Sequence, residues 1–489
     1  MKKSLLSFIM ILSVFLLAAC ATGNPFVNFF AAREPTPVNP PASGANASGA
    51  VPERKKTPAA NSAVSGTASA RSQPKSYRRP ESYETAYIYR TDTADSKMRN
   101  IPKNIEANRV SNPDEYVRQI AAYINENSAN DFERVKKAHD LTALLVRYDA
   151  ANFWANTVPA QDFRNVLKTK LAVCEGYSSL FKKLCDELRI QCDIVHGFGR
   201  GVGTSPFAGD TPANSNHAWN IVTINDGNYL IDCTWDSGYM DGRTAKQAYT
   251  TDWLFLKPEQ FLASHFPEDS KQQLMEKPLS ADEFLKLPFY KPKFFEVVEE
   301  ISPELFAINN VDGKLELEYT VKAGFEISYN IYDENGGRQF PNNSFSQREG
   351  DKYKAYFSFP GNEKYLLRIF WRKAGAKTGS GCGELGIVSS VENPVKYPTQ
   401  FVSSGKNIEI ISPLEMPLRQ GETYEFKVRV ENKNVVALIH GRNFIQLTKG
   451  EDGIFFAEAE IPKNVKELSI GIADSPRGRY EYVAQYQVF

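Results

Sequence analysis

The sequence lacks the features that mark several common protein classes. Its 58 Lys and Arg residues are matched by 58 Asp and Glu residues, so no excess of positive charge indicates a nucleic-acid-binding protein. Six cysteines in 489 residues are too few for a disulfide scaffold, and no Cys-x-x-Cys pair suggests a structural zinc site. The glycine-rich stretch at 197–203 lacks the spacing of a dinucleotide-binding loop. The composition is that of an ordinary globular protein, and the chain is long enough for two to four domains.

The first twenty residues have the pattern of a targeting segment. Lys2 and Lys3 precede Leu5–Ala19, a run that is apolar apart from two serines. The run is shorter than the roughly 20 residues of a membrane-spanning helix, and it fits a secretory signal over 1–19. Its ending, Leu17-Ala18-Ala19-Cys20, resembles the cleavage box of bacterial lipoproteins, which implies that Cys20 carries lipid.

Ala21, rather than Asp, follows this cysteine. In the sorting of lipoproteins in double-membrane bacteria, this indicates the outer membrane. We therefore expect a protein of the bacterial cell envelope that contacts the membrane through its lipid anchor alone. An ordinary signal peptide with an accidental cysteine is the alternative.

A polar linker is expected over 20–100, between the lipidated end and the folded body. Residues 31–80 contain eleven Ala, eight Pro and seven Ser but no Leu, Ile, Phe, Met or Trp. Such a stretch cannot bury enough apolar surface to offset the entropy lost on ordering, so we expect it to stay extended. Its eight basic residues could rest on anionic lipid, although a solvated spacer is the simpler explanation.

The body beyond the linker divides into two parts by its hydrophobic pattern. Over 110–290, helices are predicted from Asn112, from Asp131 and over 175–189, and strands at 192–198, 217–224 and 228–233. Helices followed by antiparallel strands are typical of an α+β domain. From about 295 onward only short strands occur, at a spacing of about 8–12 residues, which predicts two β-sandwiches over 295–393 and 398–489.

Three residues of the α+β domain are candidates for nucleophilic catalysis. Cys174 opens the third helix, where the positive potential and unpaired N–H groups favour a thiolate and can stabilise an oxyanion. His217 begins one strand, and Asp232 lies on the next strand across the turn at 225–227. Antiparallel pairing can place this carboxylate beside the imidazole. Taken singly, each residue also has a structural explanation, since a buried cysteine is the commoner case.

Several other residues are weaker candidates. Asp236 is a rival for the acid, about 13 Å further along the same strand face. Gln161 and Trp154 are possible oxyanion donors, although both also fit a structural role. Trp219 and Trp235 flank the candidate residues, as core aromatics or as walls of a substrate groove.

The remaining cysteines fit structural roles. Cys185 lies within the third helix and Cys192 opens a strand, so both are expected in the core, where they could also pair. Cys382 lies in a Gly-Ser-Gly-Cys-Gly string and is expected to be exposed, without a basic neighbour.

The order Cys, His, Asp, with spacings of 43 and 15 residues, resembles the transglutaminase-like superfamily, and more closely its kyphoscoliosis-peptidase-type branch. The local strings that carry this resemblance are 174–178, 217–220 and 231–236, together with Trp253–Phe255 and Ser264–Asp269. A β-sandwich tail after the core is also similar. The resemblance covers roughly 110–489 and is strongest over 165–270, with Cys233 standing where Pro is expected.

The resemblance implies an α+β papain-like or transglutaminase-like core followed by two all-β immunoglobulin-like sandwiches. It implies a triad that acts on amide bonds, with Cys174 as nucleophile, His217 as base and Asp232 as the orienting acid. It implies neither a cofactor nor a metal. A thioester intermediate can pass to water or to an amine, so we expect a surface-anchored peptidase or protein-glutamine acyltransferase with a protein or peptide substrate. The alternative is a non-catalytic adhesion or scaffold lipoprotein whose sandwiches bind a protein or glycan.

Overall fold

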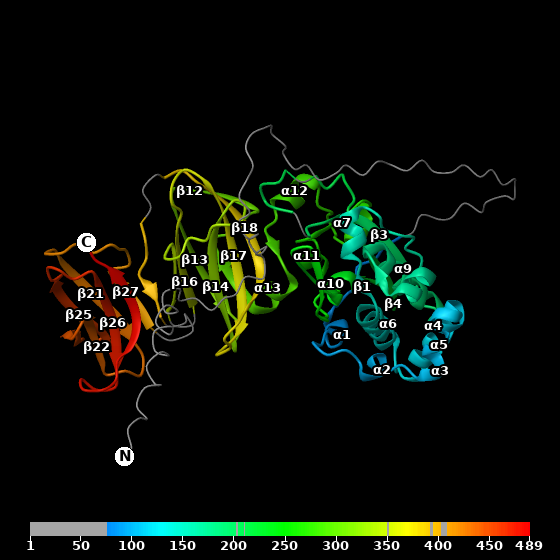
Figure 1. Ribbon diagram of the computed structural model, residues 1–489, viewed down its shortest axis with the longest axis horizontal. Helices are drawn as coiled ribbons and strands as arrows, with labels where there is room; N and C mark the ends of the chain where they lie inside the picture. The colour runs from blue at the N-terminus through cyan, green and yellow to red at the C-terminus, as the bar shows by residue number, and fades with distance from the viewer. Residues whose placement is uncertain (1–75, 202–203, 210, 350–351, 392–394, 402–407) are drawn as a thin grey trace, which may run out of the picture.

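The computed structural model describes residues 76–201, 204–209, 211–349, 352–391, 395–401 and 408–489. They form three modules in a row: a helix-rich module, a first β-sandwich and a second β-sandwich, seen from right to left in Figure 1. The expected signal segment, Cys20 and the linker up to residue 75 lie outside the described residues. Within the described part of the chain, no helix is long and apolar enough to cross a membrane.

The stretch expected to be linker up to residue 100 is folded from residue 76 onward. It carries the short helices α1 (Glu84–Tyr87) and α2 (Ser96–Arg99), followed by α3 (Lys103–Glu106) and α4 (Asn108–Ser111). Tyr83, Ala86 and Met98 are buried in the core of the first module. The expectation was wrong here because aromatic and apolar side chains reappear from Tyr77 onward and supply side chains for a core.

Three longer helices begin close to their predicted starts. Asn112 and Asn130 accept hydrogen bonds from the first turns of α5 (Pro113–Glu126) and α6 (Asp131–Leu145). The third helix, α9 (Cys174–Glu187), packs against both through Tyr177, Leu180 and other buried side chains. The short helices α7 (Ala150–Ala155) and α8 (Phe163–Thr169) and the strand pair β1 (Arg147–Tyr148) and β2 (Leu171–Ala172) complete this layer.

One antiparallel sheet, of order β8-β5-β4-β3-β9, lies against α9. Its strands are β3 (Cys192–Gly199), β4 (His217–Ile224), β5 (Gly227–Ile231), β8 (Leu254–Leu256) and β9 (His265–Pro267). Asn225 and Asp226 have positive φ in the turn that joins β4 to β5, as the hairpin prediction requires. Helix α10 (Cys233–Ser237) and the hairpin β6 (Gly238–Asp241) and β7 (Thr244–Gln247) follow β5.

Short elements lead from this sheet to the first sandwich. They are α11 (Pro258–Phe261), a 3-10 helix (Ser270–Gln273), α12 (Ala281–Lys286) and α13 (Pro292–Val297). Arg200 ties this region to the sheet, because its guanidinium donates to the carbonyls of Ala263, Phe284 and Leu287.

The first sandwich consists of two sheets that enclose an apolar core. One has the order β10-β18-β17-β14, with β12 also paired to β18, and the other has the order β11-β13-β16-β15. The strands are β10 (Phe289–Tyr290), β11 (Val298–Ser302), β12 (Ile308–Val311), β13 (Lys314–Val321), β14 (Phe325–Asp333), β15 (Ser344–Glu349), β16 (Lys352–Ser358), β17 (Lys364–Lys373) and β18 (Ser380–Ser389).

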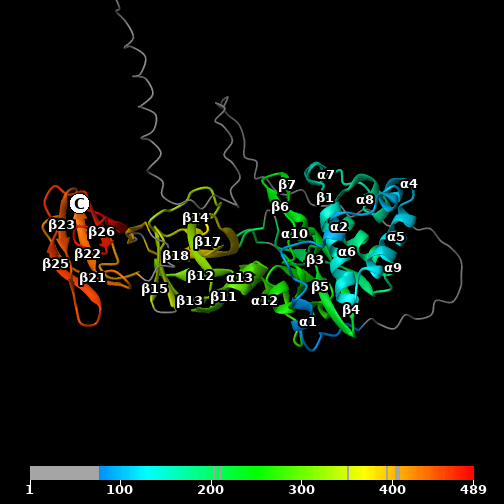
Figure 2. The same ribbon diagram turned by 90° about the horizontal axis from the view of Figure 1, so that it is seen from below.

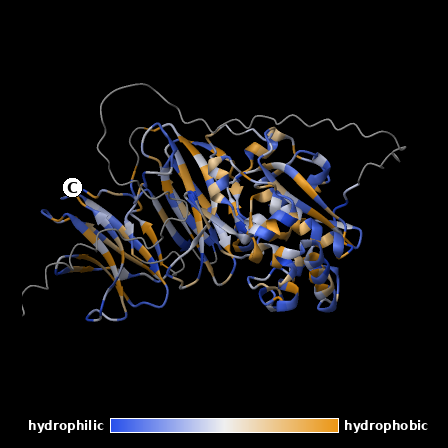
Figure 3. Ribbon diagram, turned by 45° about the vertical axis from the view of Figure 1, so that its right-hand side comes forward, coloured by the Kyte–Doolittle hydropathy of each residue, from blue (hydrophilic) through white to orange (hydrophobic). Residues whose placement is uncertain are grey.

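The second sandwich repeats this two-sheet arrangement, with orders β19-β27-β26-β22-β23 and β20-β21-β25-β24. Its strands are β19 (Thr399–Gln400), β20 (Ile408–Ser412), β21 (Thr423–Val430), β22 (Val435–His440), β23 (Asn443–Gln446), β24 (Thr448–Lys449), β25 (Ile454–Glu460), β26 (Glu467–Ala473) and β27 (Glu481–Gln487). Figure 2 shows the same row of three modules from below. In Figure 3 the apolar colour lies mainly along strands and helices.

Cys382 is buried in the core of the first sandwich, which contradicts the expectation that it is exposed. The glycines around it belong to β18 and make room for neighbouring rings. A Cβ atom at Gly383 would lie 2.9 Å from Tyr290, and one at Gly386 would lie 2.8 Å from Phe207. Small residues in a strand often mark such close approaches.

Phe207 belongs to the segment between β3 and β4, so this contact joins the first module to the first sandwich. Pro206 also faces Gly386, at 3.1 Å from the position of its missing Cβ. The ammonium group of Lys364 lies 5.3 Å from the centre of the Phe207 ring. The segment that leads to His217 therefore rests on β18.

Candidate active site

Cys174 is the first residue of α9 and is half-buried, whereas the other four described cysteines are buried and free. The start of this helix is held in place by Gln161, whose Oε1 accepts a hydrogen bond of 2.9 Å from the backbone N–H of Val173. Gly176 allows close packing here, since a Cβ atom would lie 2.6 Å from Gln161 and 2.7 Å from Ala172. The thiol thus sits at a closely packed helix N-terminus, where the helix dipole favours an anion.

His217, the first residue of β4, lies between the thiol and a carboxylate. Its Nε2–H donates to Oδ2 of Asp232 at 2.8 Å, and its ring also hydrogen-bonds with Cys174. Because Nε2 is occupied by the carboxylate, Nδ1 is the nitrogen available to the thiol. Trp235 stacks on the imidazole with ring centres 5.1 Å apart, and Gly199 also lies close to it.

Burial and mutual contact have opposite effects on the pKa values of His217 and Asp232, and mutual contact has the larger effect. Burial alone would lower the pKa of His217, but the charge and hydrogen bond of Asp232, and then the contact with Cys174, raise it to about 10. Burial likewise opposes ionisation of Asp232, yet the charge of His217 and hydrogen bonds from two histidines hold the pKa of this carboxyl well below its usual range. His217 is therefore protonated at neutral pH, and an imidazolium beside a thiol favours the thiolate.

Asp232 lies one residue beyond β5, not within a strand as predicted, and it caps α10. Its Oδ1 accepts the backbone N–H groups of Thr234 at 2.8 Å and Trp235 at 3.2 Å. The single turn of helix was missed because the Ile-Asp-Cys-Thr-Trp string continues the pattern of the strand. The cap fixes the carboxylate so that Oδ2 faces the imidazole.

Asp236, the rival acid, lies in α10 and does not contact His217. Its carboxylate accepts from Nε2 of His139 at 3.0 Å, from the Thr250 hydroxyl at 2.6 Å and from the backbone N–H of Trp253. The structure therefore brings together Cys174, His217 and Asp232 and assigns Asp236 to a separate buried network.

The two predicted oxyanion donors, Gln161 and Trp154, have other contacts. The Nε2 group of Gln161 donates to the Pro159 carbonyl at 2.9 Å. Trp154 is 40% exposed, and the Arg243 guanidinium lies over its ring. With Phe153 it forms an exposed aromatic pair beside Tyr148.

The burial of Tyr148 and the nearby Cys174 raise the pKa of this tyrosine, which places it near the thiol. No motif in the sequence indicated it, because Tyr148 reaches the site only through the pairing of β1 with β2.

Sequence reasoning missed His265, although it lies in the Ser264–Asp269 string that carries part of the resemblance. His265 is fully buried on β9, and its Nε2–H donates to Oδ2 of Asp232 at 3.2 Å. Among the described residues, His217, Asp232 and His265 are a group whose potential ligand atoms lie within 4.8 Å of one another, as a metal site requires. These atoms are already joined by hydrogen bonds, so we describe the group as a hydrogen-bonded chain.

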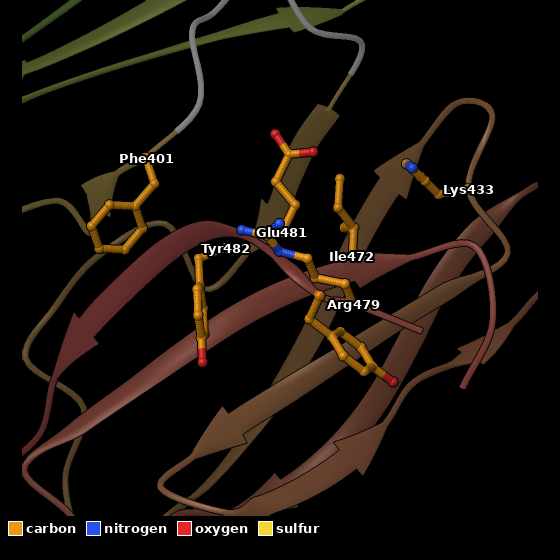
Figure 4. Close-up of a pocket in the computed structure, with 7 residues that line it drawn as sticks. Phe401, Lys433, Ile472, Arg479, Glu481 and Tyr482 are labelled. Atoms are coloured by element: carbon orange, nitrogen blue, oxygen red, sulfur yellow. The ribbon is translucent and has the colours of Figure 1, made fainter. Parts of the chain in front are cut away.

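A hollow of about 570 Å³ on the second sandwich is a separate candidate binding surface (Figure 4). Its lining includes Phe401, Arg479, Glu481 and Tyr482. Phe401 and Tyr482 are exposed and their ring centres are 6.5 Å apart. In Figure 4 Glu481 and Tyr482, neighbours on β27, point in opposite directions, as consecutive residues of a strand do.

Comparison with known proteins identifies two of the modules. Residues 118–233 match the family model of the transglutaminase-like superfamily, and residues 281–397 match the model of the KY-like, immunoglobulin-like domain. The predicted fold class is thereby confirmed, with a transglutaminase-like core followed by an immunoglobulin-like region.

Relatives among characterised proteins match at low identity. The chain is 26% identical over 258 residues to kyphoscoliosis peptidase of Mus musculus, covering 52% of this chain and 38% of that protein. It is 28% identical over 202 residues to kyphoscoliosis peptidase of Homo sapiens, covering 40% and 30%. A solved structure described as a TGase gives a TM-score of 0.20 at 18% identity, covering 30% of this chain and 37% of that one. The chain spans about a third of the length of these two curated relatives.

Proposed function

We propose that this protein is a cysteine-dependent enzyme that acts on amide bonds. The observation that carries the proposal is that the imidazole lies between the thiol and the carboxylate. His217 hydrogen-bonds with Cys174 on one side and with Asp232 at 2.8 Å on the other. A nucleophile, a base and a group that orients the base are the parts that covalent acyl transfer needs. Members of the transglutaminase-like superfamily are cysteine peptidases or acyltransferases, which supports the same class.

In the proposed reaction the Cys174 thiolate attacks the carbonyl carbon of a peptide or glutamine amide, and the carbonyl electrons move to oxygen. N–H groups at the start of α9 stabilise that oxyanion. As the C–N bond breaks, Nδ1 of His217 gives its proton to the leaving amine, and a thioester remains. Water or a second amine then attacks the thioester and gives its proton to His217, and the C–S bond breaks to restore the thiolate.

We also propose that the enzyme is a bacterial lipoprotein whose Cys20 carries the anchor, and that its substrate is a protein or peptide. The support is the Leu-Ala-Ala-Cys string at 17–20 and the polar stretch that follows it. The anchor would hold the modules at the cell envelope, facing envelope proteins.

Alkylation of the native protein at about pH 6, with the modified residue identified by mass spectrometry, tests the enzyme proposal. We expect Cys174 to react about tenfold or more faster than the other cysteines, because they are buried and a protonated His217 adjoins this one. His217→Ala should slow the reaction strongly and Asp232→Ala less, since the acid acts through the imidazole. Asp236→Asn is the matched control. Equal rates in the wild type and His217→Ala would contradict the proposal.

A binding role for the second sandwich is a further candidate, favoured by the exposed Phe401 and Tyr482 beside the hollow. Exposed aromatic rings are typical of glycan and protein contacts. If alkylation shows no dependence on His217, an adhesion or scaffold function through this surface becomes the better explanation. If the purified protein binds to cell surfaces and the folded Tyr482→Ser variant does not, that result would support the binding role.

A further inference from the structure

His265 is a buried histidine for which the proposed reaction has no use. Its ring lies within a cage of aromatic side chains, with ring centres 4.2 Å from Phe261, 4.4 Å from Trp235 and 4.9 Å from Trp253. A histidine in such a cage would be replaced at little cost by another aromatic residue, unless its nitrogen atoms are needed.

Both nitrogen atoms of His265 have a partner. Nε2 lies 3.2 Å from Oδ2 of Asp232, and Nδ1 lies 2.8 Å from the Ser264 hydroxyl. An ionised carboxylate only accepts hydrogen bonds, so the proton of a neutral imidazole must be on Nε2. Nδ1 then accepts from the hydroxyl of Ser264, which fixes this tautomer.

The acceptor capacity of Asp232 is thereby filled. Oδ1 takes two backbone N–H groups at the start of α10, and Oδ2 takes the Nε2–H groups of His217 and His265. Asp232 and His265 are fully buried, so water does not share in these bonds. A carboxylate with two donors on each oxygen has no freedom to rotate about its last side-chain bond.

We propose that His265 is a positioning residue that fixes Asp232, and through it His217, in the orientation that serves Cys174. This inference rests on the proposed function. The chain of contacts then has four members, Cys174, His217, Asp232 and His265, with Ser264 at its end. Without the second imidazole, Oδ2 lacks one hydrogen-bond donor in an apolar cage. Because an unsatisfied buried acceptor is unfavourable, the carboxylate rotates towards another donor.

Two substitutions separate positioning from packing. His265→Gln keeps an N–H donor near the position of Nε2 but loses the ring, whereas His265→Phe keeps the ring and loses the donor. Positioning predicts that the Gln variant works better than the Phe variant. Filling of the aromatic cage predicts the reverse order.

The experiment uses the full chain and two readouts: the alkylation rate of Cys174, and the far-downfield proton resonance of the His217–Asp232 hydrogen bond. In His265→Phe we expect the rate to fall between about tenfold and a hundredfold, because the base is misplaced, and the resonance to disappear. His265→Gln should stay within about threefold of the wild type and keep the resonance. Thermal unfolding of each variant checks the fold.

A Phe variant that keeps both the rate and the resonance would overturn the proposal, as would a Gln variant that performs worse than Phe. If both variants unfold, Ser264→Ala decides, since it leaves the cage intact and frees the tautomer; an unchanged rate and resonance there count against positioning. If wild-type Cys174 shows no selective reactivity, the proposed function fails, while the resonance still reports whether His265 fixes Asp232.

Discussion

Two imidazoles that share one carboxylate oxygen carry different charges in this protein. Contact with Asp232 and Cys174 raises the pKa of His217 to about 10, whereas burial lowers the pKa of His265 to about 4. His217 faces a thiol that can become an anion, while His265 faces aromatic rings and a hydroxyl group. A single negative charge on Asp232 therefore supports one imidazolium and one neutral donor.

The neutral state of His265 predicts acid sensitivity. Its folded pKa of about 4 is below the unfolded value of about 6.5, so the stabilisation is present above pH 6.5 and is lost as pH falls towards 4. The loss amounts to roughly 3 kcal/mol. Urea unfolding followed by circular dichroism across this range should give a steeper decline for the wild type than for His265→Gln. Parallel declines would show that another group controls the acid transition.

Gly199 predicts a second effect at the scale of one residue. A Cβ atom there would lie 3.0 Å from Cβ and 3.1 Å from Cδ2 of His217, so the imidazole would have to give way by a few tenths of an ångström. We expect Gly199→Ala to slow Cys174 alkylation about tenfold, with a loss of stability of about 1 kcal/mol.

Gly201→Ala is the control, because its Cβ would meet Trp235 at an ordinary 3.5 Å. Alkylation rates of the two variants, measured beside their thermal unfolding, check the prediction. Equal rates for both would show that His217 tolerates the displacement.

Regular elements were predictable from the sequence where capping or periodicity was strong. The cap at Asn112 and the apolar pattern from Asp131 predicted the starts of α5 and α6, and the strand predicted at 217–224 is β4 with its observed bounds. The sequence also placed Cys174 at a helix start and His217 at a strand start. These features depend on neighbours along the chain, which a sequence displays directly.

Features that depend on distant contacts were not predictable. His265 reaches Asp232 only because β9 pairs with β3 at the opposite edge of the sheet from β8. Cys382 is buried only because β18 lies in the middle of a sandwich sheet. The single turn of α10 is stabilised by its Asp232 cap and by burial rather than by helical periodicity.

The segment between β3 and β4 gives a prediction at the scale of elements. Gly386→Val should displace Phe207 from β18, since a Cβ atom would lie 2.8 Å from the end of its ring. The ring can swing away, so we expect little change in stability, under about 1 kcal/mol, but faster proteolysis between 204 and 216. Phe207→Ala should have the same effect. Unchanged cleavage in both variants would show that the contact does not hold the segment.

The whole chain combines a polar stretch with three folded modules, which predicts where proteases act. Residues 31–75 are rich in Pro, Ala and Ser, whereas residues from 76 pack on the first module. Limited proteolysis should cut first within 31–75 and leave a stable fragment that starts near residue 76. N-terminal sequencing of the fragment locates the cut. First cuts within 165–270 would contradict this order.

Attachment to the membrane is a second prediction for the whole molecule. Because one cysteine carries the proposed anchor, Cys20→Ser should move the protein from the detergent phase to the aqueous phase, or leave its precursor unprocessed. Phase partition of cell extracts measures this, with Cys174→Ser as the control that should stay in the detergent phase. Unchanged partition of Cys20→Ser would refute lipidation at this position.

The contact between Phe207 and Gly386 has a consequence for how the two modules evolve. Joining the transglutaminase-like core to a different sandwich by recombination would bring a side chain other than hydrogen to position 386 in most cases. In such a hybrid the segment that leads to His217 would lose its contact with β18. An aromatic residue at 207 and glycine at 386 should therefore be gained and lost together in descendants of this chain, and the two modules should travel as one genetic unit.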